Sequence, residues 1–158
     1  GMEVVIVRPP LVYGPGVKAN FLTLMRWLAR GVPLPLGAID NQRSLVGLGN
    51  LVDLLETCLT HPAAAGHTFL ASDGHDVSVT QLLTALAAAL QVKARLLPVS
   101  PLWLERGLAL VGRAEITTRL FINFAADTEK TRTLLSWTPP YSLAQGLQAT
   151  AAHYLANR

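Results

Sequence analysis

The chain is short of cysteine and of charge. Its 158 residues include one cysteine, Cys58, and only 15% Asp, Glu, Lys and Arg. A single cysteine excludes an internal disulfide and is typical of a reducing compartment, so we expect a cytoplasmic location. Cys58 lies within an apolar helical pattern, which favours a buried structural thiol over a nucleophile.

Long apolar runs are missing as well. Although 51% of the residues are hydrophobic, no uninterrupted stretch reaches the roughly 18 residues of a membrane-spanning helix, and we expect no membrane span. The first apolar run, residues 2–7, contains Glu3 and ends at Arg8. A signal peptide has neither feature at that place.

Clusters of basic or metal-binding side chains are also missing. The formal net charge is +3, but Lys and Arg are scattered and not interleaved with aromatic residues, so we expect no nucleic-acid partner. This charge remains compatible with an anionic small molecule such as a diphosphate. The histidines show no metal-ligand spacing, and no nucleophile-elbow turn supports a Ser/His/Asp triad. We therefore expect no metal.

What the chain does contain is an alternation of helical patterns with short apolar strands, which predicts an α/β fold. Residues 2–7 are typical of a fully buried strand of a parallel sheet, and a loop over residues 9–16 follows. Helices are predicted over residues 21–30, 51–60, 78–90, 101 onward, 128–135 and 142–157, and extended pieces over 33–36, 44–48, 68–71 and 95–99.

Several polar residues lie where helix N-caps are expected. These are Asn50, Ser78 or Thr80, Thr128 or Asp127, and Ser142. The three tryptophans, Trp27, Trp103 and Trp137, are interpreted as core or interface anchors. The length fits one domain.

Four segments, in this order and spacing, resemble a known family. They are VVIVRPPLVYGPG at 4–16, NQRSLVGLGNLVDLL at 41–55, HTFLASDG at 67–74 and DTEKTRTLLSWTPPYSLAQGLQAT at 127–150. Together they resemble the extended short-chain dehydrogenase/reductases, in particular the NAD-dependent epimerase/dehydratases similar to UDP-glucose and UDP-N-acetylglucosamine 4-epimerases. The resemblance covers nearly the whole chain.

The resemblance implies the C-terminal, substrate-binding portion of a Rossmann-type enzyme, without its N-terminal dinucleotide-binding half. The family's catalytic Tyr-x-x-x-Lys pair and glycine-rich cofactor turn do not occur, and Tyr13 and Lys18 have the wrong spacing. We therefore expect one substrate-binding domain over residues 1–158, a fragment of a longer epimerase/dehydratase. It would carry no catalytic residue and would be inactive alone.

The resemblance also implies which residues face ligands. Arg8, Pro9 and Pro10 correspond to contacts with NAD in the intact enzyme. Contacts with the nucleoside-diphosphate sugar, such as a UDP-sugar, correspond to Leu11, Asn20, Phe21, Leu34, Leu36, Arg43 and Arg119. The strongest candidate is Arg43, because a guanidinium group suits a diphosphate.

Each assignment has a structural alternative. Leu11 would only pack the loop, and Asn20 would be a helix N-cap. Leu34 and Leu36 would fill the core, and Arg43 would be a surface side chain.

The expected reaction of the intact enzyme is NAD-dependent oxidation and reduction of a sugar hydroxyl, at C4. Two other functions stay open: a lobe of a 4-keto-sugar reductase, or a non-catalytic interaction and assembly module. A homodimer through the first strand or exposed helices is a further expectation.

Overall fold

The computed structural model describes residues 3–110 and 123–157. The chain divides into two compact units. Unit 1 comprises Gly1–Val17, Ser44–Asp76 and Ala125–Arg158, and unit 2 comprises Lys18–Arg43 and Val77–Phe124. The interpretation of residues 1–158 as a single domain stays a prediction.

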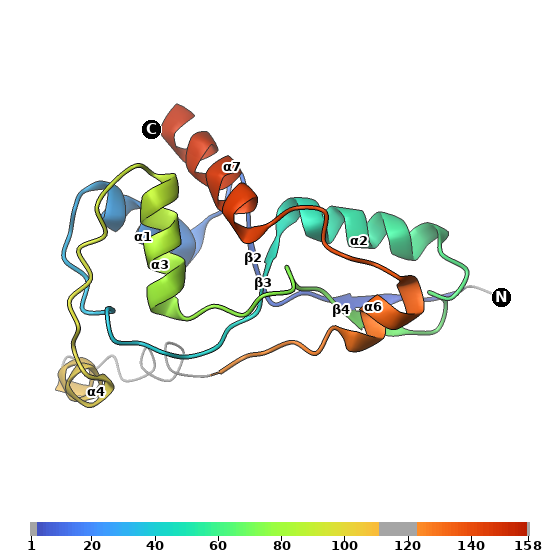
Figure 1. The fold of residues 1–158 in the computed structure, drawn as a ribbon, viewed down its shortest axis with the longest axis horizontal. Helices are drawn as coiled ribbons and strands as arrows, with labels where there is room; N and C mark the ends of the chain where they lie inside the picture. The colour runs from blue at the N-terminus through green and yellow to red at the C-terminus, as the bar shows by residue number, and fades with distance from the viewer. Residues whose placement is uncertain (1–2, 111–122, 158) are drawn as a thin grey trace. The chain divides into compact units, whose positions relative to one another are not determined.

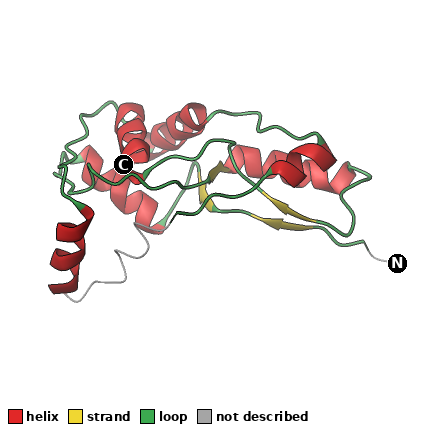
Figure 2. Cartoon of the chain, turned by 60° about the horizontal axis from the view of Figure 1, so that its bottom comes forward, coloured by secondary structure: helices red, strands yellow, loops and turns green. Residues whose placement is uncertain are grey.

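Unit 1 contains two parallel pairs of short strands, drawn in yellow in Figure 2. Strand β1 (Ile6–Arg8) pairs with β4 (Thr68–Leu70), and β2 (Leu11–Tyr13) pairs with β3 (Leu45–Gly47). With the helices described below, these strands confirm the predicted α/β fold.

The opening strand differs from its prediction. Val5 and Val7 pack against the unit 1 core, whereas Val4 is 54% and Ile6 46% exposed. Successive side chains of a strand point to opposite faces, and only one face of β1 is covered by the described residues. The expected continuous burial is therefore wrong. So is the uninterrupted loop after Pro9, because β2 forms within it.

The core of unit 1 lies between its strands and two helices. Figure 1 labels helices α2 (Leu48–Thr60) and α6 (Glu129–Leu135) in this unit. Leu54 and Cys58 of α2 and Leu135 of α6 belong to the same buried cluster as Phe69 of β4. Trp137 is 5% exposed and its indole N–H donates to Asp53 Oδ1 at 2.7 Å. Cys58 is buried, as expected.

The helix starts in unit 1 follow the predictions at two of three places. Helix α7 (Leu143–Ala156) has a capping box between Ser142 and Gln145. Thr128 is the N-cap of α6, and Asp127 Oδ1 accepts from the Glu129 N–H. Asn50 is not a cap, because α2 begins at Leu48 with Gly47 in the N-cap position.

Unit 2 is built on helices α1 (Ala19–Ala29) and α3 (Val79–Ala89), with α4 (Pro101–Leu110) following. The apolar faces of α1 and α3 supply buried side chains, among them Met25 and Leu86. Ser78 forms a capping box with Gln81, and α1 ends ahead of Gly31, whose φ is +66°. These bounds confirm the predicted helices.

Two predictions for unit 2 are only partly met. The extended pieces at 33–36 and 95–99 reduce to a parallel bridge between Leu34 and Leu96. Trp27 and Trp103 are 42% and 67% exposed, so neither is a core anchor. Among residues 3–110 and 123–157, no helix is long and apolar enough to span a bilayer.

Candidate functional site

The residues predicted to meet the cofactor and sugar lie in unit 1, between β1 and β2. Arg8 and Pro9 are exposed, Pro10 is half-buried, and Leu11 is 48% exposed. About half of the Leu11 surface is therefore available to a ligand, although the contact itself stays a prediction. Neither proline carries an N–H that could donate to a phosphate.

The remaining substrate residues that the structure describes lie in unit 2. Asn20 is the second residue of α1 and is exposed, and Lys18 occupies the N-cap position. The interpretation of Asn20 as an N-cap is therefore wrong. The first turn of α1 has no acidic residue and no side-chain cap at Lys18, so residues of the helix itself do not offset the positive end of its dipole. Phe21 is buried.

Leu34 and Leu36 are 4% and 7% exposed. Their side chains are buried as core packing requires, and a role in contacting a base stays a prediction. Arg43 is half-buried, and its backbone pairs with Val77 through two N–H···O bonds of 3.0 Å. Burial lowers the pKa of Arg43 from its ordinary value. Arg119 lies outside the described residues.

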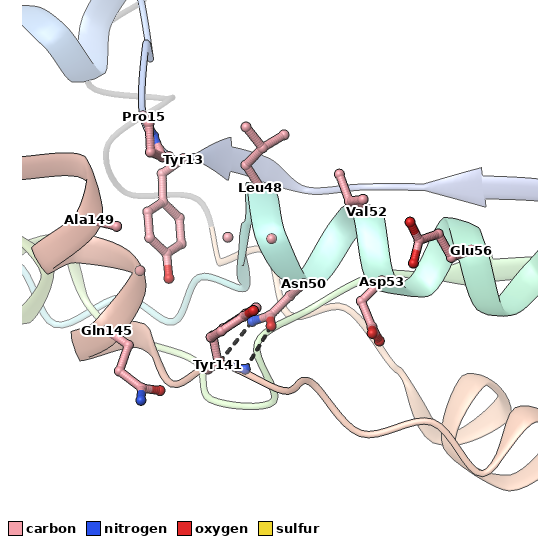
Figure 3. A pocket seen from close by; sticks show the side chains of 14 residues that line it. Tyr13, Pro15, Leu48, Asn50, Val52, Asp53, Glu56, Tyr141, Gln145 and Ala149 are labelled. Atoms are coloured by element: carbon pink, nitrogen blue, oxygen red, sulfur yellow. Dashed lines mark hydrogen bonds between the residues drawn. The ribbon is translucent and has the colours of Figure 1, made fainter. Parts of the chain in front are cut away.

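A buried polar network that the sequence did not predict lies in unit 1. Asp73 is 4% exposed and accepts from the Tyr13 hydroxyl at 2.5 Å, the Gly47 N–H at 2.8 Å and the Asn50 amide at 2.7 Å. The Asn50 side chain also bonds the backbone of Tyr141 in both directions, at 2.8 and 2.9 Å (Figure 3). A buried carboxylate is tolerated because its oxygens have donors.

The Tyr13 ring is 1% exposed and packs against α7. A Cβ at Gly146 would lie 2.6 Å from the Tyr13 hydroxyl oxygen, so α7 approaches this ring only because Gly146 has no side chain. Burial, and then the hydrogen bond and charge of Asp73, raise the pKa of Tyr13 far above its ordinary value. The phenol is therefore a donor at all physiological pH values.

A pocket of about 510 Å³ opens beside this network in unit 1. Its walls are mostly apolar and include Leu48, Val52 and Tyr141, and its charged lining residues are Asp53 and Glu56 (Figure 3). None of the residues predicted to bind ligands lines it, and Lys and Arg are absent from its described lining. This pocket is unsuited to an anionic diphosphate.

The structure also offers no metal centre in the part that it describes. No group of three His, Cys, Asp or Glu side chains over residues 3–110 and 123–157 could hold a metal ion.

No protein-family model matches the chain, but comparison with curated proteins gives relatives. It is 49% identical, over 98% of its length, to a UDP-glucose 4-epimerase of Vibrio cholerae, and spans 47% of that relative. The chain is related to the nucleotide-sugar epimerases. It spans about half the length of the curated relatives that it matches.

Solved structures agree in fold. A Thermotoga maritima UDP-glucose 4-epimerase with UDP-glucose aligns with 99% of this chain over 47% of its own length, at a TM-score of 0.70 and 18% identity. The Bordetella bronchiseptica enzyme WbmG, in complex with NAD and UDP, aligns with 98% of this chain over 44% of its own length, at a TM-score of 0.69 and 16% identity. The expected resemblance to the extended short-chain dehydrogenase/reductases is confirmed.

Proposed function

We propose that this chain provides the sugar-nucleotide-binding part of a nucleoside-diphosphate-sugar epimerase or dehydratase. The observation that carries the proposal is the 49% identity to a UDP-glucose 4-epimerase over nearly the whole chain. The two-fold difference in length between the chain and its relatives supports a part, rather than the whole, of such an enzyme. A cytoplasmic location belongs to the same proposal, supported by the free, buried thiol of Cys58.

The proposed ligand is a UDP-sugar. In unit 2, the uncapped N-terminus of α1 beside the exposed Asn20 favours an anion. The backbone of Arg43 is fixed by its pairing with Val77, and this pairing restricts where the half-buried Arg43 side chain can reach.

The proposed reaction of the intact enzyme is oxidation of the sugar hydroxyl at C4 and return of the hydride to the opposite face of the ring. When bound, NAD supplies the acceptor and donor of that hydride. The segment Arg8–Pro10 is proposed to contact the nicotinamide end through the apolar rings of Pro9, which is exposed, and Pro10, which is half-buried. It does not fit a pyrophosphate cradle, which needs several N–H donors.

This chain has neither a Tyr-x-x-x-Lys pair nor a glycine-rich cofactor turn. Its own residues are therefore proposed to bind and orient the sugar nucleotide, and we expect no turnover from the chain alone. Epimerisation of UDP-glucose by the purified chain would contradict that part of the proposal.

Isothermal titration with UDP-glucose tests the binding proposal, and Arg43→Ala is the decisive variant. Because one charge-assisted contact is worth about 1.5–3 kcal/mol, we expect its loss to weaken binding by roughly ten- to a hundred-fold. Arg26→Ala, an exposed arginine of the same unit, is the matched control and should leave the affinity unchanged. Equal affinities of the two variants would remove Arg43 from the site.

An interaction and assembly module is the second candidate, favoured by an apolar stripe on α2. Leu48, Val52, Leu55 and Leu59 recur at intervals of four, three and four residues, and each is at least 42% exposed. This spacing is that of a helix-pairing seam. A chain that self-associates strongly and does not bind UDP or UDP-glucose would favour this candidate over the first.

A further inference from the structure

The inference concerns how the segment Arg8–Leu11 is held. Three consecutive residues after β4, Ala71, Ser72 and Asp73, are each no more than 4% exposed. This tripeptide, called the 71–73 segment, contacts Arg8, the first residue of Arg8–Leu11, and Tyr13, which lies two residues beyond Leu11.

The first contact lies at Arg8, the start of Arg8–Leu11. The Ala71 N–H donates to the carbonyl oxygen of Arg8 at 3.3 Å, which continues the parallel pairing of β1 with β4 by one residue. Pro9 and Pro10 then follow, and each proline ring restricts its own φ. The N-terminal end of the segment is thus fixed by backbone geometry.

The second contact lies beyond its other end. The Tyr13 hydroxyl, two residues after Leu11, donates to Asp73 Oδ2 at 2.5 Å. Asp73 is held in turn: its own N–H donates to the Leu45 carbonyl at 2.8 Å, and its Oδ1 accepts from Gly47 and Asn50. Leu45 is also the strand partner of Leu11. The carboxylate therefore lies at the junction of β2, β3 and the start of α2.

We propose that Asp73, acting through the Tyr13 hydroxyl, is the positioning residue that sets the conformation of Arg8–Leu11. The role in ligand binding rests on the proposed function, whereas the mechanical role does not. A phenylalanine at position 13 would fill the same space beside Gly146, so packing alone does not require the hydroxyl. The Tyr13 hydroxyl instead donates a hydrogen bond to the Asp73 carboxylate, which also accepts from Gly47 and Asn50. This bond fixes the distance between the 71–73 segment and β2.

Tyr13→Phe tests the proposal, because it keeps the ring and removes only the donor; Asp73 retains two donors. Thr150→Val is the matched control. Thr150 is 1% exposed, and its hydroxyl donates to the Gly146 carbonyl at 2.7 Å, so this variant also deletes one buried hydroxyl bond in unit 1. Amide hydrogen exchange, measured by NMR, reports local opening of the chain at Leu11 and Val12.

We expect the Leu11 and Val12 amides to exchange about tenfold faster in Tyr13→Phe than in Thr150→Val. The comparison is made at urea concentrations that give the two variants the same free energy of global unfolding. Asp73→Asn, where it folds, should change the same amides. Equal exchange in Tyr13→Phe and Thr150→Val would overturn the positioning role.

Titration with UDP-glucose separates this inference from the proposed function. If both hold, Tyr13→Phe weakens binding about tenfold while Thr150→Val does not. If no protein binds UDP-glucose but exchange differs, the binding proposal fails and the mechanical role stands. Binding that is equal in Tyr13→Phe and Thr150→Val would overturn the ligand role of Tyr13.

Discussion

At the scale of single residues, the buried polar contacts of unit 1 reach far along the chain. Asp73 bonds residues that are 60, 26 and 23 positions away. A sequence pattern of a few residues carries no information about such partners. The segment around Asp73 could be predicted as a turn from Gly74, whose φ is +81°, but its carboxylate could not be predicted as the centre of a network.

Asn50 shows the same limit from the opposite direction. Its residue type favours a helix N-cap, and that local preference led to a wrong prediction. In the structure its amide joins Asp73 to the backbone of Tyr141. The long-range hydrogen bonds of Asn50 to Asp73 and to the backbone of Tyr141 outweigh the capping preference.

The raised pKa of Tyr13 predicts a loss of stability at alkaline pH. Below its ordinary value of 10.0, Tyr13 is protonated in both folded and unfolded chains, and its contribution to stability is fully present. Above that pH the unfolded chain loses the proton and the folded chain keeps it. The free energy of unfolding then falls, by up to about 1.4 kcal/mol per pH unit.

Urea unfolding at pH 9, 10 and 11 checks this prediction against Tyr13→Phe. The variant lacks the group, so its stability should fall less steeply above pH 10. Parallel stability curves would show that Tyr13 ionises as readily in the folded chain as in the unfolded one.

At the scale of elements, helices were easier to predict than strands. Helices α1, α3, α6 and α7 are set by periodic apolar residues and by turn and capping residues close in sequence. The division of residues 2–16 into β1 and β2 depends instead on pairing with β4 and β3, more than 30 residues away. The apolar run alone predicted one longer strand.

The capping box of α7 gives a stability prediction. In Ser142→Ala the Gln145 N–H loses its acceptor, the Ser142 oxygen 3.3 Å away, and we expect a loss of about 1 kcal/mol. Thr133→Ala, an exposed change within α6, should stay within about 0.5 kcal/mol of the parent. Equal unfolding midpoints for the parent and Ser142→Ala would contradict a stabilising cap.

At the scale of the whole molecule, apolar surface is the feature without an explanation inside the described chain. The four residues of the α2 stripe are exposed, and so are Ile6 of β1 and Val4 just before this strand. Apolar surface of this extent is typical of an interaction face. The homodimer expected from the sequence stays a prediction, and this surface is where it would form.

Sedimentation measurements test self-association through the stripe. We expect the double variant Leu55→Glu, Leu59→Glu to have a lower mean mass than the parent at high concentration, because two charges replace apolar contacts. The double variant Gln148→Glu, Ala152→Glu adds the same charges at the same spacing on exposed positions of α7 and serves as control. Equal masses for both double variants would exclude the stripe as the contact.

The relationship to nucleotide-sugar epimerases was predictable because four separate motifs occur in the family's order. The individual ligand residues were less so, since Leu34, Leu36 and Phe21 are as typical of a core as of a site, and all three are buried. Residue type predicts chemistry for Arg43 better than for these apolar side chains.

The central claim is that these residues bind a sugar nucleotide, and amide chemical-shift mapping with UDP-glucose tests it most directly. We predict saturable shifts at Leu11, Asn20, Phe21 and Arg43, at millimolar ligand or below. An absence of shifts, or shifts confined to the acidic pocket beside Tyr141, would contradict the claim.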